Sequence, residues 1–185
     1  MQIAYQLQFQ AEDYLAWEAS QAEKHEYWNG EVYAMGSARR EHVVVSLNIA
    51  SALKQRLRGK PCQPYIADMK LRVDEYNAFF YPDVMVSCHA DDRKAEQFLS
   101  HPSVIIEVLS DSTAAYDRGD KFLAYRTIKS LQEYLIVDVD SRRVECYRRA
   151  ANHEWLLHDY FATDSCQLHS LGFEIPLAEF FEELD

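Results

Sequence analysis

Two acidic residues stand inside the most apolar segments of this sequence. Asp83 lies in the run Phe-Phe-Tyr-Pro-Asp-Val-Met-Val (79–86), and Glu107 lies in Val-Ile-Ile-Glu-Val-Leu (104–109). Nearly continuous apolar runs are typical of strands covered on both faces of a sheet. A carboxylate in such a strand costs free energy unless it is paired, hydrogen-bonded or bound to a cation. Two interpretations stay open: both acids face one cation, or each sits solvated or salt-bridged at a strand end.

The cation that suits two such carboxylates is Mg²⁺ (or Mn²⁺). Mg²⁺ takes oxygen ligands, keeps several waters, and is often held by one or two carboxylates together with a substrate phosphate. We therefore expect the carboxylates of Asp83 and Glu107 to lie roughly 4–6 Å apart, given oxygen ligands at about 2.0–2.6 Å. Without a metal the two acids repel each other, so at least one should have a raised pKa.

The elements that position these acids follow from apolar spacing. Helices are expected over residues 9–18, 41–57 and 116–128, the last with Ser110, Ser112 and Thr113 as capping residues. A hairpin is expected over 27–35, because Asn29-Gly30 is a strong turn signal. The buried stripe of the second helix would hold Val44, Leu47, Ile49, Leu53 and Leu57. Strands are expected over 65–73, 79–86, 104–109, 134–139 and 144–148. This order predicts an α/β (α+β) fold, a mixed β-sheet flanked by helices.

The composition is that of a folded globular chain. Its 185 residues are 48% hydrophobic, with five glycines and five prolines, which supports a sizeable core and argues against disorder. This length fits a single domain over residues 1–185. The first ten residues do not resemble a signal peptide, and no apolar stretch approaches the ~20 residues of a membrane helix. We therefore expect a soluble, cytoplasmic protein.

The net charge of −11 disfavours one mode of nucleic-acid binding. A protein that neutralises many phosphates usually shows a basic stripe. Here the basic residues form local clusters, at positions 39–40, 54–60, 142–143 and 148–149. A local basic cleft or a dimer cleft therefore fits this sequence better than a broad basic surface.

The four cysteines are isolated in the sequence, at positions 62, 88, 146 and 166, with no C-x-x-C pair. A disulfide framework or a zinc knuckle is therefore not expected, and buried reduced thiols are the preferred interpretation. The seven histidines show no tight pairing either, so a histidine-based metal site is not expected.

The spacing of the two acids resembles a known motif. Pro82-Asp83, followed 24 residues later by Glu107 in an apolar strand, looks like the PD-(D/E)XK nuclease motif. The lysine of that motif, two positions after the second acid, is replaced by Leu109. In a subset of the superfamily this lysine has moved to the following helix, where the present sequence has Lys121.

The fuller pattern resembles one bacterial branch of that superfamily, the Uma-two family of restriction endonucleases. The resemblance covers most of the chain and rests on the order of several motifs. These are Tyr27-Trp28-Asn29-Gly30-Glu31-Val32-Tyr33, His42, Tyr81-Pro82-Asp83-Val84, Ile106-Glu107-Val108-Leu109-Ser110 with Ser112-Thr113, Asp117 to Lys121 with Tyr125, and Glu133-Tyr134-Leu135-Ile136-Val137-Asp138. Leu135 stands where the family often has Trp, a change that affects packing more than chemistry.

The resemblance implies a metal-dependent phosphodiesterase, a restriction-type DNA endonuclease that uses Mg²⁺. Asp83 and Glu107 would hold the metal, with the backbone carbonyl of Val108 as a further ligand. Lys121 would stabilise the phosphate or position the attacking water. Alternatively, Lys121 is exposed and forms an i,i+4 ion pair with Asp117, and such an ion pair contributes little to stability. Cleavage of both strands of a duplex needs two active sites, which implies a homodimer.

Three accessory residues are candidates for the same site. Glu31 would add a carboxylate, or is a solvated turn residue. His42, near a helix start, would approach the acids, or is a histidine at the edge of the core. Tyr125, one turn after Lys121, would orient the lysine, or is a core aromatic.

Two rival functions remain open. One is a catalytically inactive module with the nuclease fold that binds nucleic acid or a protein partner, which the acidic charge and the missing strand lysine favour. The other is a metal-dependent hydrolase that acts on another phosphoester. No Walker loop, G-x-G-x-x-G or G-x-S-x-G motif occurs, so the corresponding enzyme classes are set aside.

Overall fold

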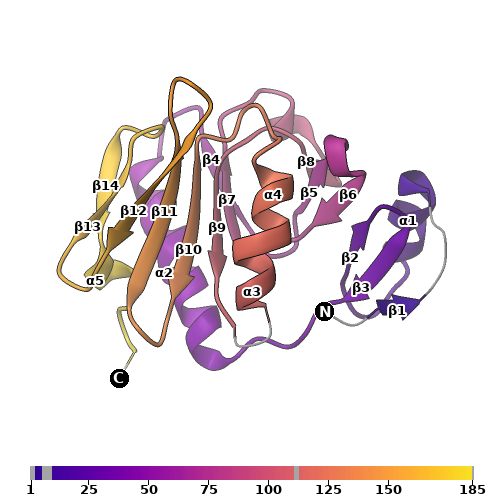
Figure 1. The fold of residues 1–185 in the computed structure, drawn as a ribbon, viewed down its shortest axis with the longest axis horizontal. Helices are drawn as coiled ribbons and strands as arrows, with labels where there is room; N and C mark the ends of the chain where they lie inside the picture. The colour runs from indigo at the N-terminus through magenta and orange to yellow at the C-terminus, as the bar shows by residue number, and fades with distance from the viewer. Residues whose placement is uncertain (1–2, 6–9, 111–112, 185) are drawn as a thin grey trace.

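The computed structural model describes residues 3–5, 10–110 and 113–184. Within these residues the strands form two six-stranded sheets and one two-stranded sheet (Figure 1). The central sheet has the order β12 (Trp155–Tyr160), β11 (Arg143–Arg149), β10 (Glu133–Asp138), β9 (Pro102–Val108), β7 (Val84–Ser87) and β4 (Gln63–Ile66). It is mixed, because β9 and β10 are parallel whereas β7 and β9, like β10 and β11, are antiparallel.

The second six-stranded sheet, here called the N-terminal sheet, lies at one end of the molecule. Its order is β1 (Ile3–Tyr5), β3 (Glu31–Ala34), β2 (His25–Trp28), β6 (Ala78–Phe80), β5 (Lys70–Val73) and β8 (Phe98–Leu99). At the opposite end, β13 (Ser165–Leu168) and β14 (Phe173–Pro176) pair with each other (Figure 1). The fold is therefore a mixed α+β architecture with helices against the sheets, as the sequence predicts, but with two large sheets in place of one.

The helices cover both faces of the central sheet. Helix α2 (Arg40–Arg56) packs on one face, through Val45, Ile49 and Leu53. The other face is covered by one helical stretch, α3 (Ala114–Tyr116), a π-helical turn (Asp117–Lys121) and α4 (Phe122–Tyr125). Short elements complete the chain: α1 (Ala11–Glu18), α5 (Leu177–Phe180) and the 3₁₀ turns Asp74–Tyr76 and Asp92–Lys94. No helix of the described residues is long and apolar enough to cross a membrane.

The hairpin and the strands on either side of the helical stretch are confirmed. Asn29 and Gly30 both have positive φ values, 46° and 99°, as a tight hairpin turn between β2 and β3 requires. Strands β9, β10 and β11 lie within two residues of the predicted ranges. Two predicted positions, Phe9 at the start of the first helix and Ser112 as a cap, lie outside the described residues.

Two predicted strands are wrong in the same way, because each divides between the two large sheets. Residues 65–73 divide between β4 and β5, and residues 79–86 divide between β6 and β7. The second break falls at Tyr81-Pro82-Asp83, where proline has no N–H to donate to a ladder. Asp83 therefore lies just before β7 rather than inside a strand.

Two details of the predicted helices are also wrong. Leu47 is 61% exposed, because α2 turns Val45 and Ala52 toward the sheet instead. Thr113 occupies the N-cap position of α3 without a side-chain capping hydrogen bond. The strand β12, the pair β13–β14 and α5 were not predicted from the sequence.

The prediction of four reduced cysteines is wrong for two of them. Cys62 and Cys88 form a disulfide, whereas Cys146 and Cys166 are free and buried. Cys62 immediately precedes β4 and Cys88 immediately follows β7, and these strands pair with Gln63 opposite Ser87. The antiparallel pairing therefore places the two thiols side by side, although 26 residues separate them in the sequence.

Reduction of this disulfide should lower the free energy of unfolding. A cross-link between residues 26 positions apart restricts the unfolded chain, which stabilises a protein by roughly 3 kcal/mol. Urea unfolding with and without dithiothreitol measures the difference. The double variant Cys62→Ala/Cys88→Ala is the control, and its stability should not respond to dithiothreitol. An unchanged unfolding midpoint of the wild-type protein after reduction would contradict the expectation.

Candidate active site

Asp83 and Glu107 meet at one end of the central sheet. Strands β7 and β9 are antiparallel with Val84 opposite Ile106, so the residue before β7 lies beside Glu107 near the end of β9. The backbone N–H of Asp83 donates to Glu107 Oε2 at 3.2 Å, and the N–H of Val108 donates to Asp83 Oδ2 at 2.8 Å. The structure therefore brings together the two acids that the sequence singles out.

Lys121 lies in the same place, and its environment is buried rather than exposed. The side chain is 7% exposed, and its ammonium lies 3.1 Å from Glu107 Oε1 and 3.5 Å from Asp117 Oδ1. The interpretation of Lys121 as an exposed partner of Asp117 is wrong, because both residues point into the core. Their turn is π-helical, a rare geometry that is frequent at functional sites.

The third acid at the ammonium is Glu26 of β2, which the sequence analysis missed. Its Oε1 lies 3.0 Å from Lys121 Nζ and accepts a hydrogen bond from the N–H of Tyr81 at 3.3 Å. Glu26 is a buried acid between His25 and Tyr27, which are also buried. The reasoning used for Asp83 and Glu107, an acid inside a buried strand, could have found it.

Glu31, for which the sequence leaves open both an added carboxylate of the site and a solvated turn residue, does not contact the cluster. It is exposed at the start of β3, and its carboxylate accepts a hydrogen bond from Tyr33 at 2.5 Å. In the β2–β3 register Glu31 lies opposite Trp28, so it shares a sheet face with Glu26 but sits next to the turn, two residue positions away along the hairpin. The structure thus supports the solvated interpretation of Glu31.

His42 and Tyr125 both contact the acids. His42 Nε2 lies 2.9 Å from Asp83 Oδ1, so the first turn of α2 supports this carboxylate. The Tyr125 hydroxyl donates to Glu107 Oε1 at 2.8 Å, and its ring is fully buried. Tyr125 is therefore a core aromatic whose hydroxyl is a hydrogen-bond donor to Glu107. The expected hydrogen bond that would orient Lys121 is made to Glu107 instead.

The charges of this cluster do not balance, since it holds four acids, Glu26, Asp83, Glu107 and Asp117, and one lysine, whose ammonium contacts three of them. Burial raises the pKa of Glu107 to about 8, with further repulsion from Asp117 and Asp83 that Lys121 only partly offsets. Burial also raises the pKa of Glu26 and of Asp117. Burial alone would lower the pKa of Lys121, but Glu107 and Glu26 outweigh it and raise that pKa well above the ordinary value.

Such a surplus of carboxylates suits an additional cation. Each oxygen of Asp83 has one hydrogen-bond partner, His42 for Oδ1 and Val108 for Oδ2, and a carboxylate oxygen has two lone pairs. Among the residues that the structure describes, no group of three or more His, Cys, Asp or Glu side chains is arranged to hold a metal. Asp83 and Glu107 form a smaller set, of the kind that Mg²⁺ uses with water and substrate phosphate.

The family comparison agrees with the nuclease resemblance. Residues 11–178 match the Uma2 (Uma-two) family, which is described as "Putative restriction endonuclease". The chain belongs to this family. The match covers every residue of the cluster, from Glu26 to Tyr125.

Two relatives of this chain come from Synechocystis sp. (strain ATCC 27184 / PCC 6803 / Kazusa) and are described as uncharacterized proteins. One, slr1290, is 40% identical over 161 residues, which cover 87% of this chain and 85% of the relative. The other, sll1609, is 36% identical over 151 residues, which cover 80% of this chain and 84% of the relative.

A solved structure from Anabaena variabilis ATCC 29413, described as a putative nuclease belonging to DUF820, has the same fold. The TM-score is 0.76, and the match covers 94% of this chain and 97% of that protein. The sequence identity is 15%, so the likeness concerns the fold alone. Together these comparisons identify a Uma2 protein with a nuclease fold.

Removal of the Lys121 charge should destabilise the protein strongly, because it leaves buried acids without their cation. Breaking a buried ion pair by removing one partner typically costs about 3–5 kcal/mol, so Lys121→Ala should lower the free energy of unfolding by that order. Lys121→Met keeps the packing of the stem and separates the loss of charge from the loss of volume. Lys129→Ala, on an exposed residue, is the control. Equal stability of Lys121→Ala and wild type in urea unfolding would refute the buried cluster.

Stability should fall as the pH rises from about 5 to about 8. The pKa of Glu107 is raised from 4.5 to about 8 in the folded protein, so the folded state holds a proton that the unfolded state has released in this range. The free energy of unfolding then falls by up to about 1.4 kcal/mol per pH unit for each such carboxyl. The raised pKa of His42 acts with the same sign. Urea unfolding at several pH values measures the slope, and Glu107→Gln should flatten it; an unchanged slope in this variant would contradict the assignment.

Proposed function

We propose that this Uma2 protein is a metal-dependent phosphodiesterase, a restriction-type DNA endonuclease that uses Mg²⁺ (or Mn²⁺). One observation carries the proposal: at one sheet end the Glu107 carboxylate accepts from the N–H of Asp83 and the Asp83 carboxylate accepts from the N–H of Val108, with a buried lysine 3.1 Å from Glu107. Two carboxylates and a lysine are the groups that phosphodiester hydrolysis with a divalent cation needs. The family description and the nuclease fold of the neighbour support the same class of reaction.

The proposed reaction assigns metal binding to two acids and charge stabilisation to one lysine. Asp83 and Glu107 would hold the metal, together with the backbone carbonyl of Val108. The chemistry that a bound metal would supply there is polarisation of a phosphoryl oxygen and a lower pKa of a coordinated water. Lys121 supplies a fixed positive charge beside Glu107, where it stabilises negative charge on the phosphate or orients the water.

Three further residues keep these groups in position. Glu26 contacts the ammonium of Lys121 from the N-terminal sheet, and Tyr125 donates to Glu107. His42 contacts Asp83 Oδ1, the oxygen that Val108 does not use. Contacts of this kind fix the orientation of carboxylate ligands, and their loss typically weakens metal binding or activity 10- to 100-fold.

The substrate and the assembly follow from the same reaction. The substrate is DNA, and cleavage of both strands of a duplex requires two copies of the chain, hence a homodimer. We treat residues 1–185 as one nuclease-like domain that acts on DNA in the cytoplasm.

A second candidate is a catalytically inactive module with this fold that binds nucleic acid or a protein partner. The contacts of Lys121 favour it, because three carboxylates already surround the ammonium. Binding of Mn²⁺ separates the two functions, since an inactive module does not require a metal at Asp83 and Glu107.

Purified protein should nick supercoiled plasmid in the presence of Mg²⁺ or Mn²⁺. Asp83→Asn should abolish cleavage and weaken Mn²⁺ binding measured by calorimetry, because it removes a charged ligand. Lys121→Met should retain Mn²⁺ binding but lose roughly 10²–10³ in cleavage rate, the loss typical of one preorganised charged donor. Asp13→Asn, on an exposed residue of α1, is the matched control and should cleave normally.

The two candidate functions predict different results in this assay. Stoichiometric Mn²⁺ binding that depends on Asp83, with metal-dependent nicking, supports the nuclease. Neither binding nor nicking by folded wild-type protein refutes it and favours the inactive module. Nicking that Asp83→Asn leaves unchanged would point to a contaminating nuclease.

A further inference from the structure

A small cavity lies at the ends of β9 and β10, and several of its lining residues are close in sequence to residues of the acidic cluster. Its volume is about 120 Å³, and its described lining comprises Arg39, Leu109, Ser110, Ala114, Arg118, Asp138, Val139 and Asp140. Pockets for drug-sized ligands are roughly 300–1,000 Å³. The cavity therefore has room for one planar ring system rather than for a whole nucleotide.

The cavity adjoins the proposed metal ligands through three segments. Leu109 follows Glu107 by two residues, a distance of about 7 Å in extended chain. Arg118 follows Asp117 directly, and Arg39 precedes His42 by three residues. Successive nucleotides of one strand rise about 3.4 Å. A strand at Asp83 and Glu107 thus has a neighbouring base within reach of the cavity.

The lining combines hydrogen-bond donors and acceptors with no net charge. Two arginines supply donors and two aspartates supply acceptors, and Leu109 and Val139 add apolar surface. A phosphate group offers acceptors only and carries a negative charge, so it would match the two arginines but be repelled by the two aspartates. A nucleobase offers both donors and acceptors on its edges and apolar faces, which matches this lining.

Among the bases, guanine matches best. Its O6 and N7 are adjacent acceptors suited to an arginine fork, and its N2 amino group is a donor suited to a carboxylate. Adenine and cytosine lack the O6/N7 acceptor pair. From this complementarity we infer that the cavity is a guanine-binding subsite, in which Arg39 and Arg118 face O6 and N7 and Asp138 or Asp140 faces the amino group. The inference rests on the proposed function only in that a nucleic-acid strand crosses the acidic cluster.

The two arginines differ in how they are held. Glu145, a buried acid outside the lining, accepts hydrogen bonds from Arg118 Nε at 3.2 Å and Nη2 at 2.9 Å, so this guanidinium is oriented before any ligand arrives. Arg39 lies 3.7 Å from Asp140, and both side chains are exposed. Exposed pairs of this kind contribute little and rearrange readily. Arg118 therefore provides a preformed contact, and Arg39 adjusts to the base.

A ring held in such a cavity cannot remain stacked in a duplex. The inferred substrate is a single strand, or a duplex in which one base is turned out of the stack, as enzymes that enclose a base require. Discrimination by one bidentate base contact corresponds to a preference on the order of 10-fold or more.

Binding without cleavage tests the inference directly. The probes are fluorescent twelve-residue dT strands that carry a single dG, dA or deoxyinosine, with wild-type protein in EDTA. The dG strand should bind roughly 10-fold more tightly than the dA strand, and deoxyinosine, which lacks the N2 amino group, should fall between them. Arg118→Lys and Arg39→Gln should abolish the preference for dG, and Asp138→Asn should abolish only the difference between dG and deoxyinosine if Asp138 faces the amino group.

The salt dependence distinguishes a base contact from a phosphate contact. Loss of a base contact leaves the slope of log K against log salt unchanged, whereas loss of one phosphate contact in a single strand reduces it by about 0.7. Arg93→Gln is the matched control, because Arg93 follows β7 at the other end of the central sheet and should alter neither quantity.

Each outcome decides the matter. A preference for dG that the cavity variants lose at an unchanged slope supports the subsite. Equal affinity of wild type for dG and dA strands, a preference that survives both arginine substitutions, or a uniform loss with a reduced slope overturns it. A dG preference without nicking in the presence of Mg²⁺ or Mn²⁺ would refute the proposed function and leave the subsite intact. Metal-dependent nicking without a dG preference would refute the subsite and leave the proposed function intact.

Discussion

The ammonium group of Lys121 is the contact on which the rest of the arrangement depends. It lies within 3.5 Å of carboxylate oxygens of Glu26, Glu107 and Asp117. These acids belong to the N-terminal sheet, to the central sheet and to the helical stretch that carries Lys121 itself. A buried ammonium requires carboxylate partners, and buried carboxylates require a cation. The cluster is therefore stable only when all three elements are in place, so the fold and the site form together.

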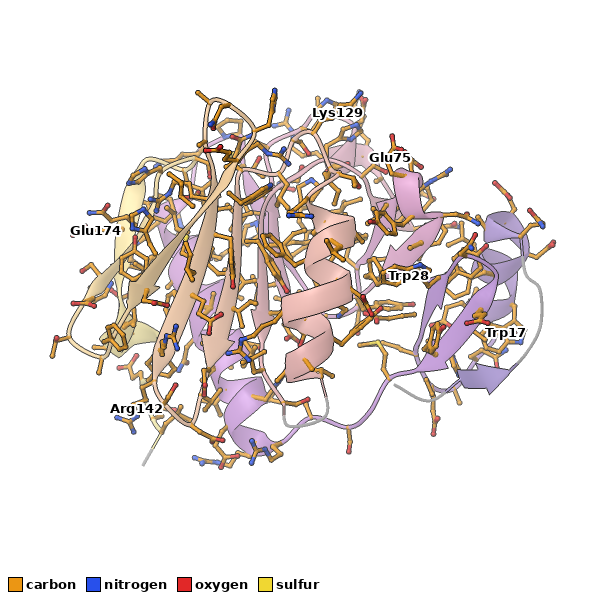
Figure 2. The ribbon with its side chains drawn as sticks, viewed as in Figure 1. Trp17, Trp28, Glu75, Lys129, Arg142 and Glu174 are labelled. Atoms are coloured by element: carbon orange, nitrogen blue, oxygen red, sulfur yellow. A yellow bond between two sulfur atoms is a disulfide. The ribbon has the colours of Figure 1, made fainter. Side chains whose placement is uncertain are left out.

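Aromatic side chains around the cluster make the pairing of Lys121 with its carboxylate partners more necessary. Trp28 lies between the N-terminal strands and the helical stretch, with its ring 5.4 Å from Phe80 and 6.1 Å from Tyr116 (Figure 2). The Lys121 ammonium itself lies 5.9 Å from the Phe80 ring and 5.6 Å from the Tyr116 ring. Exclusion of water by these rings raises both the cost of an unpaired charge and the strength of each ion pair. The same surroundings let a lysine on a helix reach Glu107, while Leu109 occupies the strand position of the usual motif lysine as a buried apolar residue.

Local sequence patterns predicted those parts of the fold that local interactions determine. Asn29-Gly30 specified a hairpin because few residues adopt two successive positive φ values, and the run at 104–109 specified a buried strand because a covered strand excludes polar side chains. Local patterns did not specify which sheet a strand joins. The predicted strand 79–86 divided at Pro82, since its first half pairs with β2 and β5 and its second half pairs with β4 and β9 in the other sheet. The Cys62–Cys88 disulfide was missed for the same reason, because only the pairing of β4 with β7 makes these residues neighbours.

For the candidate site, the sequence by itself determined the identity and approximate position of Asp83, Glu107 and Lys121, since acids in apolar runs and the order of the family motifs are visible without coordinates. The tertiary structure alone decided that Glu26 rather than Glu31 joins them, that His42 supports Asp83, and that Lys121 is buried. Glu26 and Glu31 lie on one face of the β2–β3 hairpin, and which end of that face meets the neighbouring layer depends on contacts across the core. Burial is likewise a property of the packed layers. A lysine spaced four residues from an aspartate has the same local sequence whether it faces water or three carboxylates.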